Sequence, residues 1–339
     1  YLAYQSPHNP LQAPREDIMK YRGRYLKGWM AIRQARIKNQ IKFGILDKNA
    51  ALPAYPLNLP DWDSLSPEQK DLEDLRMSVY AAMVERMDNG IGKLMKALQQ
   101  NGQDKNTLIL FLSDNGNDPF TSTDAAMLRQ GLLPGDAGSN WQIGMGWAFA
   151  GVTPWRLYKI SQHSGGVMTG AIAWWPSGIK EQGKVIKSSL HVVDVMPTLL
   201  NIVAANRATY ASLAGETFLP LLQGKKWQRK GPMFFQFVDN RSVKTNRWNL
   251  VEVDGNGWEL YDVQKDFFET KDLARQHPEI VKELEAKWLN WWMTDGNTKT
   301  YKPESTKTGP HYFPQGDRGS GKIYIPTPMP ESLSKKYKN

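Results

Sequence analysis

The feature that most constrains this chain is a short apolar run that ends abruptly in polar residues. Residues 107–112 read Thr-Leu-Ile-Leu-Phe-Leu, and Ser-Asp-Asn-Gly follows directly at 113–116. A run of this length predicts a buried strand of an α/β sheet. Because such sheets bind ligands just outside the carboxyl ends of their strands, Asp114 and Asn115 are candidate site residues.

Two interpretations of Asp114 and Asn115 remain open from these residues alone. A carboxylate beside a carboxamide offers oxygen ligands, which suit a hard cation such as Ca²⁺ or Mg²⁺. Asp-Asn-Gly is also good turn chemistry, and such a triplet ends many strands without binding anything. The choice between the two interpretations therefore depends on the rest of the sequence.

Two other segments carry polar residues in a similar setting. A strand is predicted at residues 1–4, and the proline-rich loop after it contains His8. Lys159 is followed by the paired glycines Gly165 and Gly166, which predict a loop where the backbone comes close to another group. Taken singly, a histidine after a proline and an isolated lysine are most often surface residues, so neither identifies a site.

Several segments together resemble the sulfatase family of the alkaline phosphatase-like superfamily, and the bacterial arylsulfatases in particular. They occur in the family's order over most of residues 1–293. The matching segments are Ala3–Gln12, Phe111–Gly116, Thr153–Lys159, His191–Leu200, Trp258–Asp262 and Asp266–Thr270. The resemblance rests on their number and order, because each segment is short.

The resemblance implies a role for four residues. Asp114 and Asn115 match two of the family's ligands to a divalent cation, usually Ca²⁺, with Mg²⁺ as the alternative. His8 and Lys159 match the residues that contact the sulfate near its bridging oxygen. Negative charge builds on that oxygen as a sulfate ester is cleaved, so a lysine and a histidine there suit the reaction. For His163, packing is the expected role.

The chain departs from the family at the nucleophile. Sulfatases of this type convert a cysteine or serine of a Cys/Ser-x-Pro-x-Arg motif to formylglycine, and this chain has no cysteine. Its nearest segment, Val152–Arg156, has valine at that position. The family's early acidic pair of metal ligands is also absent. We therefore expect a carboxyl-terminal portion of a longer sulfatase, with formylglycine on a missing amino-terminal segment.

The expected fold is a partial alkaline phosphatase-like layered α/β core over residues 1–224, as the resemblance implies. Within it, helices are predicted over residues 16–38 and 77–98. The second has apolar residues at alternating steps of three and four, which predicts one buried stripe. Asn101-Gly102 is expected to end it.

The texture of the sequence changes after residue 224. Short β-like runs separated by Asn- and Gly-rich turns predict a small antiparallel sheet, and a packing helix is expected to begin at Pro278. These elements define a predicted subdomain over residues 225–299. Residues 300–339 are rich in proline and glycine and are expected to form an extended tail.

Composition limits the partners. No apolar stretch reaches the roughly 20 residues that span a bilayer, and no nucleic-acid-binding module is present. The formal net charge is +9, which favours anionic substrates through electrostatic attraction. The expected substrate is an aryl or carbohydrate sulfate ester, and the resemblance suggests a periplasmic or secreted location.

Three functions remain open from the sequence. The first is a sulfuric ester hydrolase of the arylsulfatase type, whose isolated 339-residue chain is expected to be inactive. The second is a phosphate or phosphonate ester hydrolase of the same superfamily. The third is a non-catalytic binding protein on the sulfatase scaffold.

Overall fold

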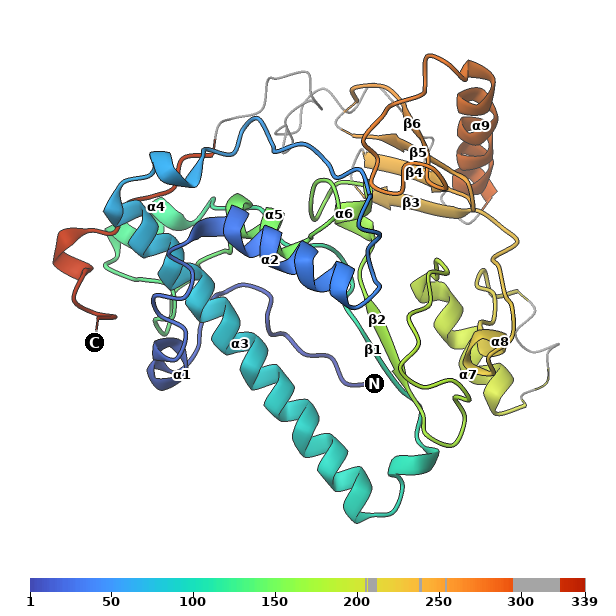
Figure 1. The fold of residues 1–339 in the computed structure, drawn as a ribbon, viewed down its shortest axis with the longest axis horizontal. Helices are drawn as coiled ribbons and strands as arrows, with labels where there is room; N and C mark the ends of the chain where they lie inside the picture. The colour runs from blue at the N-terminus through green and yellow to red at the C-terminus, as the bar shows by residue number, and fades with distance from the viewer. Residues whose placement is uncertain (205, 207–211, 238–239, 254, 295–323, 339) are drawn as a thin grey trace.

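A computed structural model describes residues 1–204, 206, 212–237, 240–253, 255–294 and 324–338 (Figure 1). Its described strands form two separate sheets. The first contains the antiparallel pair β1 (Ile109–Leu112) and β2 (Ala171–Trp174). The second is antiparallel, in the order β3 (Met233–Phe237), β4 (Asn240–Lys244), β5 (Trp248–Glu252) and β6 (Glu259–Asp262).

Helices form most of the remaining regular structure among the described residues. In chain order the described helices are α1 (Arg15–Met19), α2 (Gly28–Lys42), α3 (Pro67–Gln100), α4 (Asp124–Arg129), α5 (Met145–Gly151), α6 (Ser164–Val167), α7 (Val195–Ile202), α8 (Leu219–Leu222) and α9 (Pro278–Thr294). This mixed α/β arrangement agrees with the predicted fold class, a partial alkaline phosphatase-like core with a small antiparallel sheet. Among the described residues, no helix is long and apolar enough to cross a membrane.

The long helix α3 begins ten residues before the predicted residue 77, at a start that local capping explains, and ends close to its predicted end. Ser66 accepts a hydrogen bond from the Gln69 N–H, and the Gln69 side chain accepts one from the Ser66 N–H, which forms a capping box. Pro67 occupies the first turn, where its missing N–H is not needed. At the other end, the positive φ of Gly102 terminates the helix, as predicted.

The helix predicted over residues 16–38 is wrong as one element. The structure has α1 and α2 there, separated by an irregular segment. Gly23 and Gly28 both have φ near +80°, which breaks helical geometry. The carboxylate of Asp74 accepts hydrogen bonds from the N–H groups of Gly23 and Tyr25, at 2.9 Å each. A tertiary contact to α3 therefore fixes the break.

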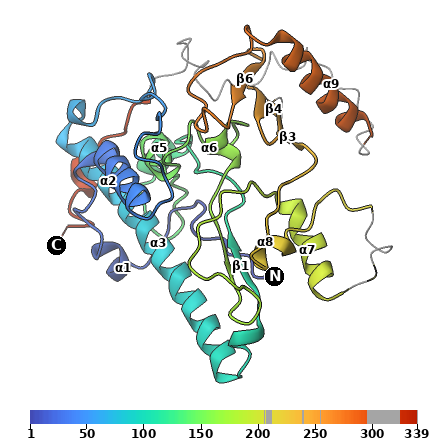
Figure 2. The same cartoon turned by 45° about the vertical axis from the view of Figure 1, so that its right-hand side comes forward.

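The predicted buried stripe of α3, which includes Met77, Tyr80, Val84 and Leu94, is only partly present, since Met77 and Tyr80 pack partly buried against the core. The buried face is formed by other residues, among them Leu72, Leu75 and Val79, whereas Val84 and Leu94 of the predicted stripe are exposed. The reason is position, because the second half of α3 projects from the body in both views (Figures 1 and 2). The periodic pattern identifies which face of a helix is apolar. In the second half of α3 that face is left uncovered at Val84 and Leu94.

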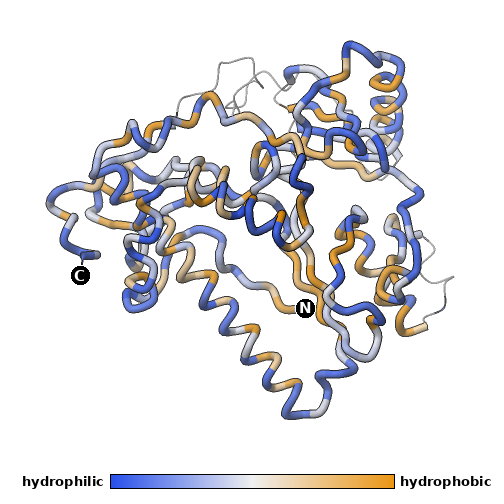
Figure 3. The backbone as a smooth tube through the Cα atoms, viewed as in Figure 1, coloured by the Kyte–Doolittle hydropathy of each residue, from blue (hydrophilic) through white to orange (hydrophobic). Residues whose placement is uncertain are grey.

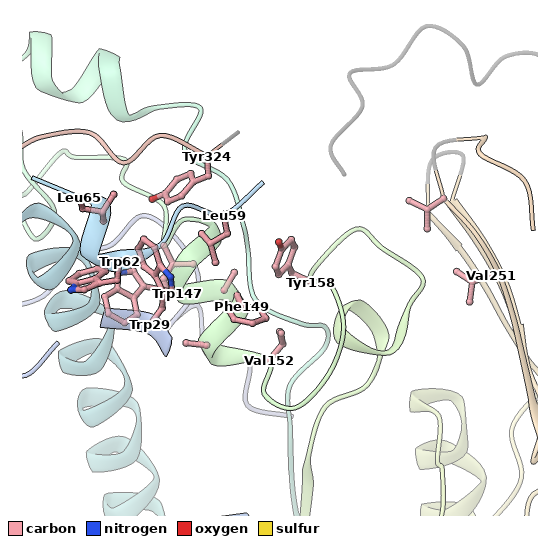
Figure 4. Packing of buried hydrophobic residues seen from close by; sticks show 14 residues of the cluster. Trp29, Leu59, Trp62, Leu65, Trp147, Phe149, Val152, Tyr158, Val251 and Tyr324 are labelled. Atoms are coloured by element: carbon pink, nitrogen blue, oxygen red, sulfur yellow. The ribbon is translucent and has the colours of Figure 1, made fainter. Parts of the chain in front are cut away.

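Tryptophans dominate the core beside α2 and α5. The ring centroids of Trp29 and Trp62 lie 4.8 Å apart, and that of Trp147 lies 6.0 Å from Trp29, all in edge-to-face geometry (Figure 4). Such contacts add to the hydrophobic energy of burial. Leu11 and Trp141 belong to a second buried cluster against α3. These contacts anchor the segments that reach the candidate site.

Part of the predicted tail packs on this core. The Tyr324 hydroxyl donates a 2.9 Å hydrogen bond to the buried Glu73 carboxylate, and the Tyr337 hydroxyl donates one of 3.0 Å to Asp136. Both tyrosines are buried. Residues 300–323 of the predicted tail lie outside the described part of the chain.

The first sheet differs from its prediction in two respects. Residues 1–4 form no strand, since they lie exposed without strand pairing. The strand β1 is not buried, because within the described part only β2 pairs with it and its faces stay open. Phe111 is 37% exposed, Leu112 40% and Ile172 of β2 63%. Figure 3 shows these strands as an apolar stretch next to the amino terminus.

The second sheet agrees closely with its prediction. Val243, Leu250 and Leu260 point from β4, β5 and β6 into one fully buried cluster, which Leu284 and Trp288 of α9 complete. Figures 1 and 2 show α9 lying against the face of this sheet.

Candidate active site

The loop after β1 lies against the segment that carries Lys159. The Gly116 N–H donates a 2.9 Å hydrogen bond to the Gly166 carbonyl, and the Lys159 N–H donates one of 3.0 Å to the Asn117 carbonyl. These two bonds join segments that are far apart in sequence. They bring the neighbours of Asp114 and Asn115 beside residues 156–164, which we call the Lys159 loop.

Glycines make this close contact possible. A Cβ atom on Gly116 would lie 1.8 Å from the Gly165 carbonyl oxygen, which no side chain tolerates. A Cβ on Gly165 would meet the Leu157 carbonyl oxygen at 2.1 Å, and one on Gly166 would meet the Ser161 carbonyl oxygen at 2.0 Å. The close backbone approach predicted from the paired glycines is therefore present.

His8 and Lys159, which the resemblance pairs, are in direct contact. Lys159 Nζ lies 2.9 Å from His8 Nε2, across 151 residues of sequence. His8 Nδ1 lies 2.9 Å from the Asn9 carbonyl oxygen, which only accepts hydrogen bonds. Nδ1 therefore carries a proton, and Nε2 of the neutral ring accepts from the Lys159 ammonium. Both side chains reach solvent, so a substrate can approach them.

Backbone contacts on both sides hold the His8 loop. The His8 N–H donates a 2.9 Å hydrogen bond to the Gln5 carbonyl, within a turn. Beyond it, the Leu11 N–H donates one of 3.0 Å to the Trp141 carbonyl, and the Leu11 side chain is buried in the second core cluster. His8 thus projects from a loop anchored to the core, although no strand precedes it.

Asp114 and Asn115 lie at the end of β1 with their side-chain oxygens available. Asp114 Oδ1 accepts a 3.0 Å hydrogen bond from the Asn115 N–H, a local turn contact. The Asn115 amide nitrogen donates to the Gly116 carbonyl, which leaves its oxygen for another partner. The pair fits part of a hard-cation site. Within the described residues no cluster of three or more His, Cys, Asp or Glu side chains completes one.

Next to the Lys159 loop lies a polar network that the sequence analysis missed. His163, expected only to pack, is buried; its Nδ1 lies 2.9 Å from Ser161 Oγ and its Nε2 lies 2.8 Å from Glu259 Oε2. Arg156 Nη1 lies 3.0 Å from the same carboxylate oxygen. Glu259 belongs to a segment that carried the family resemblance, so a signal for it was present.

The network fixes the charge of Glu259. Burial alone would raise the pKa of this carboxyl, but His163, Arg156 and the Tyr261 hydroxyl together hold it well below its ordinary value. Burial raises the pKa of Tyr261, so its hydroxyl stays protonated and donates to Glu259. The carboxylate therefore remains ionised and bound at neutral pH.

Comparisons with known proteins agree with one family over most of the chain. The family model described as sulfatase matches residues 1–205. A second model, described as the carboxyl-terminal part of N-sulphoglucosamine sulphohydrolase, matches residues 159–292. The two matches overlap over residues 159–205, a stretch that begins at Lys159.

Curated relatives give the same result. An uncharacterised sulfatase of Schizosaccharomyces pombe is 31% identical over 317 residues, covering 85% of this chain and 56% of that protein. An arylsulfatase of Klebsiella aerogenes is 36% identical over 231 residues, covering 66% of this chain and 49% of its own length. This chain thus spans about half the length of these relatives.

Among solved structures, the complex of Ps i-CgsB with k-i-k-neocarrahexaose superposes with a TM-score of 0.56 at 22% identity. The superposed region covers 90% of this chain and 52% of the Ps i-CgsB chain. At this identity the likeness concerns the fold alone.

Proposed function

This chain belongs to the sulfatase family, and from that premise we propose that it supplies part of the active site of an enzyme that hydrolyses sulfate monoesters. The observation that carries the proposal is the 2.9 Å contact between Lys159 Nζ and His8 Nε2. Two residues so distant in sequence meet at the solvent-facing edge of a loop packed against the Asp114 segment. A net charge of +9 favours an anionic substrate.

Lys159 and His8 act at the leaving oxygen in this proposal. As the bond between sulfur and the bridging oxygen breaks, that oxygen becomes anionic and needs a proton or a nearby cation. The Lys159 ammonium supplies the cation, and the proton that it shares with His8 Nε2 lies where it is transferable to the departing alcohol or phenol. A catalytic pair of this kind matters most when the leaving group is a poor one.

Asp114 and Asn115 hold a divalent cation in the proposal, Ca²⁺ in the first place and Mg²⁺ as the alternative. Their donor set, one carboxylate and one carboxamide oxygen, suits such hard ions. When bound, the cation would polarise the sulfate oxygens as a Lewis acid. The two residues are only part of a coordination shell, so the remaining ligands must come from elsewhere.

The nucleophile is proposed to come from a separate, amino-terminal segment that bears formylglycine. Support comes from the sequence, which has no cysteine and no Ser-x-Pro-x-Arg motif. We call the protein in which this chain is joined by that segment the complete enzyme. The 339-residue chain alone is then expected to show no turnover. A periplasmic or secreted location is part of the same proposal.

The substrate is proposed to be an aryl or carbohydrate sulfate. The arylsulfatase relative supports the first, and the match to the carboxyl-terminal model of N-sulphoglucosamine sulphohydrolase supports the second. A phosphate or phosphonate ester hydrolase is not favoured, because the matched family and its curated relatives are sulfatases.

The metal assignment is tested with Asp114→Asn in the complete enzyme. Asparagine keeps the oxygen that accepts from the Asn115 N–H, so the turn survives, but the negative charge is lost. If Asp114 is a metal ligand, the variant should contain less metal and its activity should depend on added Ca²⁺. If Asp114 only forms the turn, metal content and activity should be unchanged, and that result would refute the assignment. Asp104→Asn, in the short 3-10 helix Asp104–Asn106 that precedes β1, is the matched control.

A further inference from the structure

The backbone around Lys159 has conformations that need outside support. Leu157 has φ +58° and Ile160 has φ +80°, so two bulky residues flanking Lys159 lie in the left-handed region. Such conformations are rare for these residue types and persist only where the surroundings fix them. The question is which groups fix this loop.

One carboxylate binds the loop on both sides of Lys159. Glu259 of β6 forms the 3.0 Å ion pair with Arg156, before Lys159, and the 2.8 Å contact with His163, after it. The Tyr261 hydroxyl, which donates to Glu259, also lies 2.5 Å from Arg156 Nη1. Arg156 and His163 of the loop and Tyr261 of the sheet thus all bind the Glu259 carboxylate.

A second carboxylate holds the far end of the loop. Glu269 is buried, and its oxygens accept hydrogen bonds from the Ser164 N–H at 2.9 Å and the Ser164 hydroxyl at 2.6 Å. Asn249 of β5 donates to the same carboxylate at 2.5 Å. Lys244 of β4, also buried, donates to the Ser164 hydroxyl at 3.2 Å. Strands of the second sheet therefore fix the first residue of α6.

Apolar contacts join the same two regions. The Trp155 ring lies 4.9 Å from that of Phe267 and 5.2 Å from that of Phe268 between centroids. Figures 1 and 2 show α6 beside the β3–β6 sheet. The Lys159 loop is thus seated on the second sheet and its β6–α9 connection, while Lys159 itself points away to His8.

We propose that Glu259 and Glu269 are positioning residues for Lys159. They bind Arg156, His163 and Ser164, and through these contacts they fix the strained loop so that the ammonium meets His8. Both carboxylates bind the loop and the second sheet, and they act on Lys159 through these contacts. The inference rests on the proposed function for its catalytic meaning, but the positioning itself is a structural statement that is measurable without turnover.

The ring signals of His8 measure the position of Lys159 directly. The sequence has five histidines, and the His8 signal is the one lost in His8→Gln. In the 339-residue chain, Lys159→Met removes the ammonium at Nε2 and gives the reference shift of the His8 Hε1 resonance. We expect Glu269→Gln and Glu259→Gln to shift this resonance in the same direction and by a comparable amount. Neither residue is in contact with His8.

Glu252→Gln is the matched control. Glu252 is a mostly buried carboxylate of the same sheet, but its partner is Arg241 rather than the loop. It is expected to lower thermal stability without moving the His8 resonance. If Glu269→Gln and Glu259→Gln behave like Glu252→Gln, with stability reduced and His8 unmoved, the positioning role is wrong. The two variants act on opposite sides of the loop, so one remains informative if the other fails to fold.

Hydrolysis by the complete enzyme separates this inference from the proposed function. Misplacing a reacting group by about 1 Å can cost about 100-fold in rate, so we expect both variants to slow poor leaving groups by about 10- to 100-fold. If Lys159→Met leaves hydrolysis unchanged while His8 shifts in all three variants, the function is wrong and the positioning stands. If Lys159→Met slows hydrolysis but both glutamine variants leave rate and resonance unchanged, the positioning is wrong.

Discussion

The two sheets of this molecule contrast sharply in how their apolar residues are covered. In β3–β6, four strands and α9 enclose Val243, Leu250 and Trp288 completely. In β1–β2, two strands of entirely apolar sequence leave Phe111 and Ile172 open to solvent. A two-stranded sheet is at best marginal on its own, whereas several strands with a packed helix are self-supporting.

The contrast shows which part of the molecule fixes the backbone at the candidate site. Asp114 follows the uncovered sheet, and Lys159 precedes its second strand. The contacts that define the Lys159 loop come mainly from the covered sheet and its β6–α9 connection, through Glu259 and Glu269. Candidate site residues thus lie on segments that adjoin the exposed strands, while the enclosed subdomain supplies many of the contacts that hold the Lys159 loop.

The largest expected effect comes from opening the covered sheet. Trp288→Ala removes a fully buried ring and its hydrogen bond to the Phe235 carbonyl, and we expect a loss of about 3–5 kcal/mol in unfolding free energy. Ile172→Ala on β2 removes an exposed side chain and should change stability by less than about 0.5 kcal/mol. Denaturant unfolding measures both, and similar losses would contradict the contrast.

A smaller effect is expected where the two loops meet. Gly116→Ala places a methyl group against the Gly165 carbonyl, and the resulting backbone shift should cost about 1–3 kcal/mol. Gly92 in α3 has open space around it, so Gly92→Ala should instead stabilise the protein by about 0.5–1 kcal/mol. Chemical denaturation tests the pair, and equal effects of the same sign would show that the loop contact carries no strain.

The last effect concerns how the contribution of Glu259 to stability changes with pH. Its pKa is lowered in the folded chain, so its ion pairs stabilise the fold above the unfolded-state pKa of about 4.3. That stabilisation is lost as pH falls through the lower folded-state pKa. Unfolding curves should therefore show Glu259→Gln as destabilised at pH 7, with the difference shrinking below about pH 4.

The control for this titration is an exposed ion pair. Glu283 pairs with Lys287 on the solvent side of α9 at 2.7 Å. Glu283→Gln should cost at most about 0.5 kcal/mol, so its difference from the parent stays small at every pH. A pH-independent deficit in Glu259→Gln would mean that packing, rather than charge, sets the contribution of Glu259.

Local signals in the sequence predicted the covered sheet and the carboxyl end of α3 well, whereas the start of α3 lies at Pro67 rather than at the predicted residue 77. The turns between the strands, the start of α9 at Pro278 and the Asn-Gly stop at residue 101 depend on neighbouring residues alone. The break between α1 and α2 was not predictable in this way, because it depends on Asp74 of a later helix. Periodicity likewise identified an apolar face of α3 but not whether anything covers it.

The candidate site also contains residues that the sequence predicted and residues that only the structure revealed. Family resemblance named His8 and Lys159, and the structure brings their side chains together, while their catalytic roles stay predictions. The buried partners of the loop were not found, since Glu259 and Glu269 lie about a hundred positions from it and no local pattern announces a tertiary ion pair. The two segments that contain them were nevertheless among those that carried the resemblance.

The most direct test of the central claim is the leaving-group dependence of sulfate ester hydrolysis in Lys159→Ala of the complete enzyme. If Lys159 stabilises the charge on the departing oxygen, kcat/KM should fall most for alkyl or sugar sulfates and least for activated aryl sulfates. A uniform decrease across leaving groups would mean that Lys159 only binds the substrate. Unchanged kcat/KM for every ester would contradict the claim that this pair belongs to the active site.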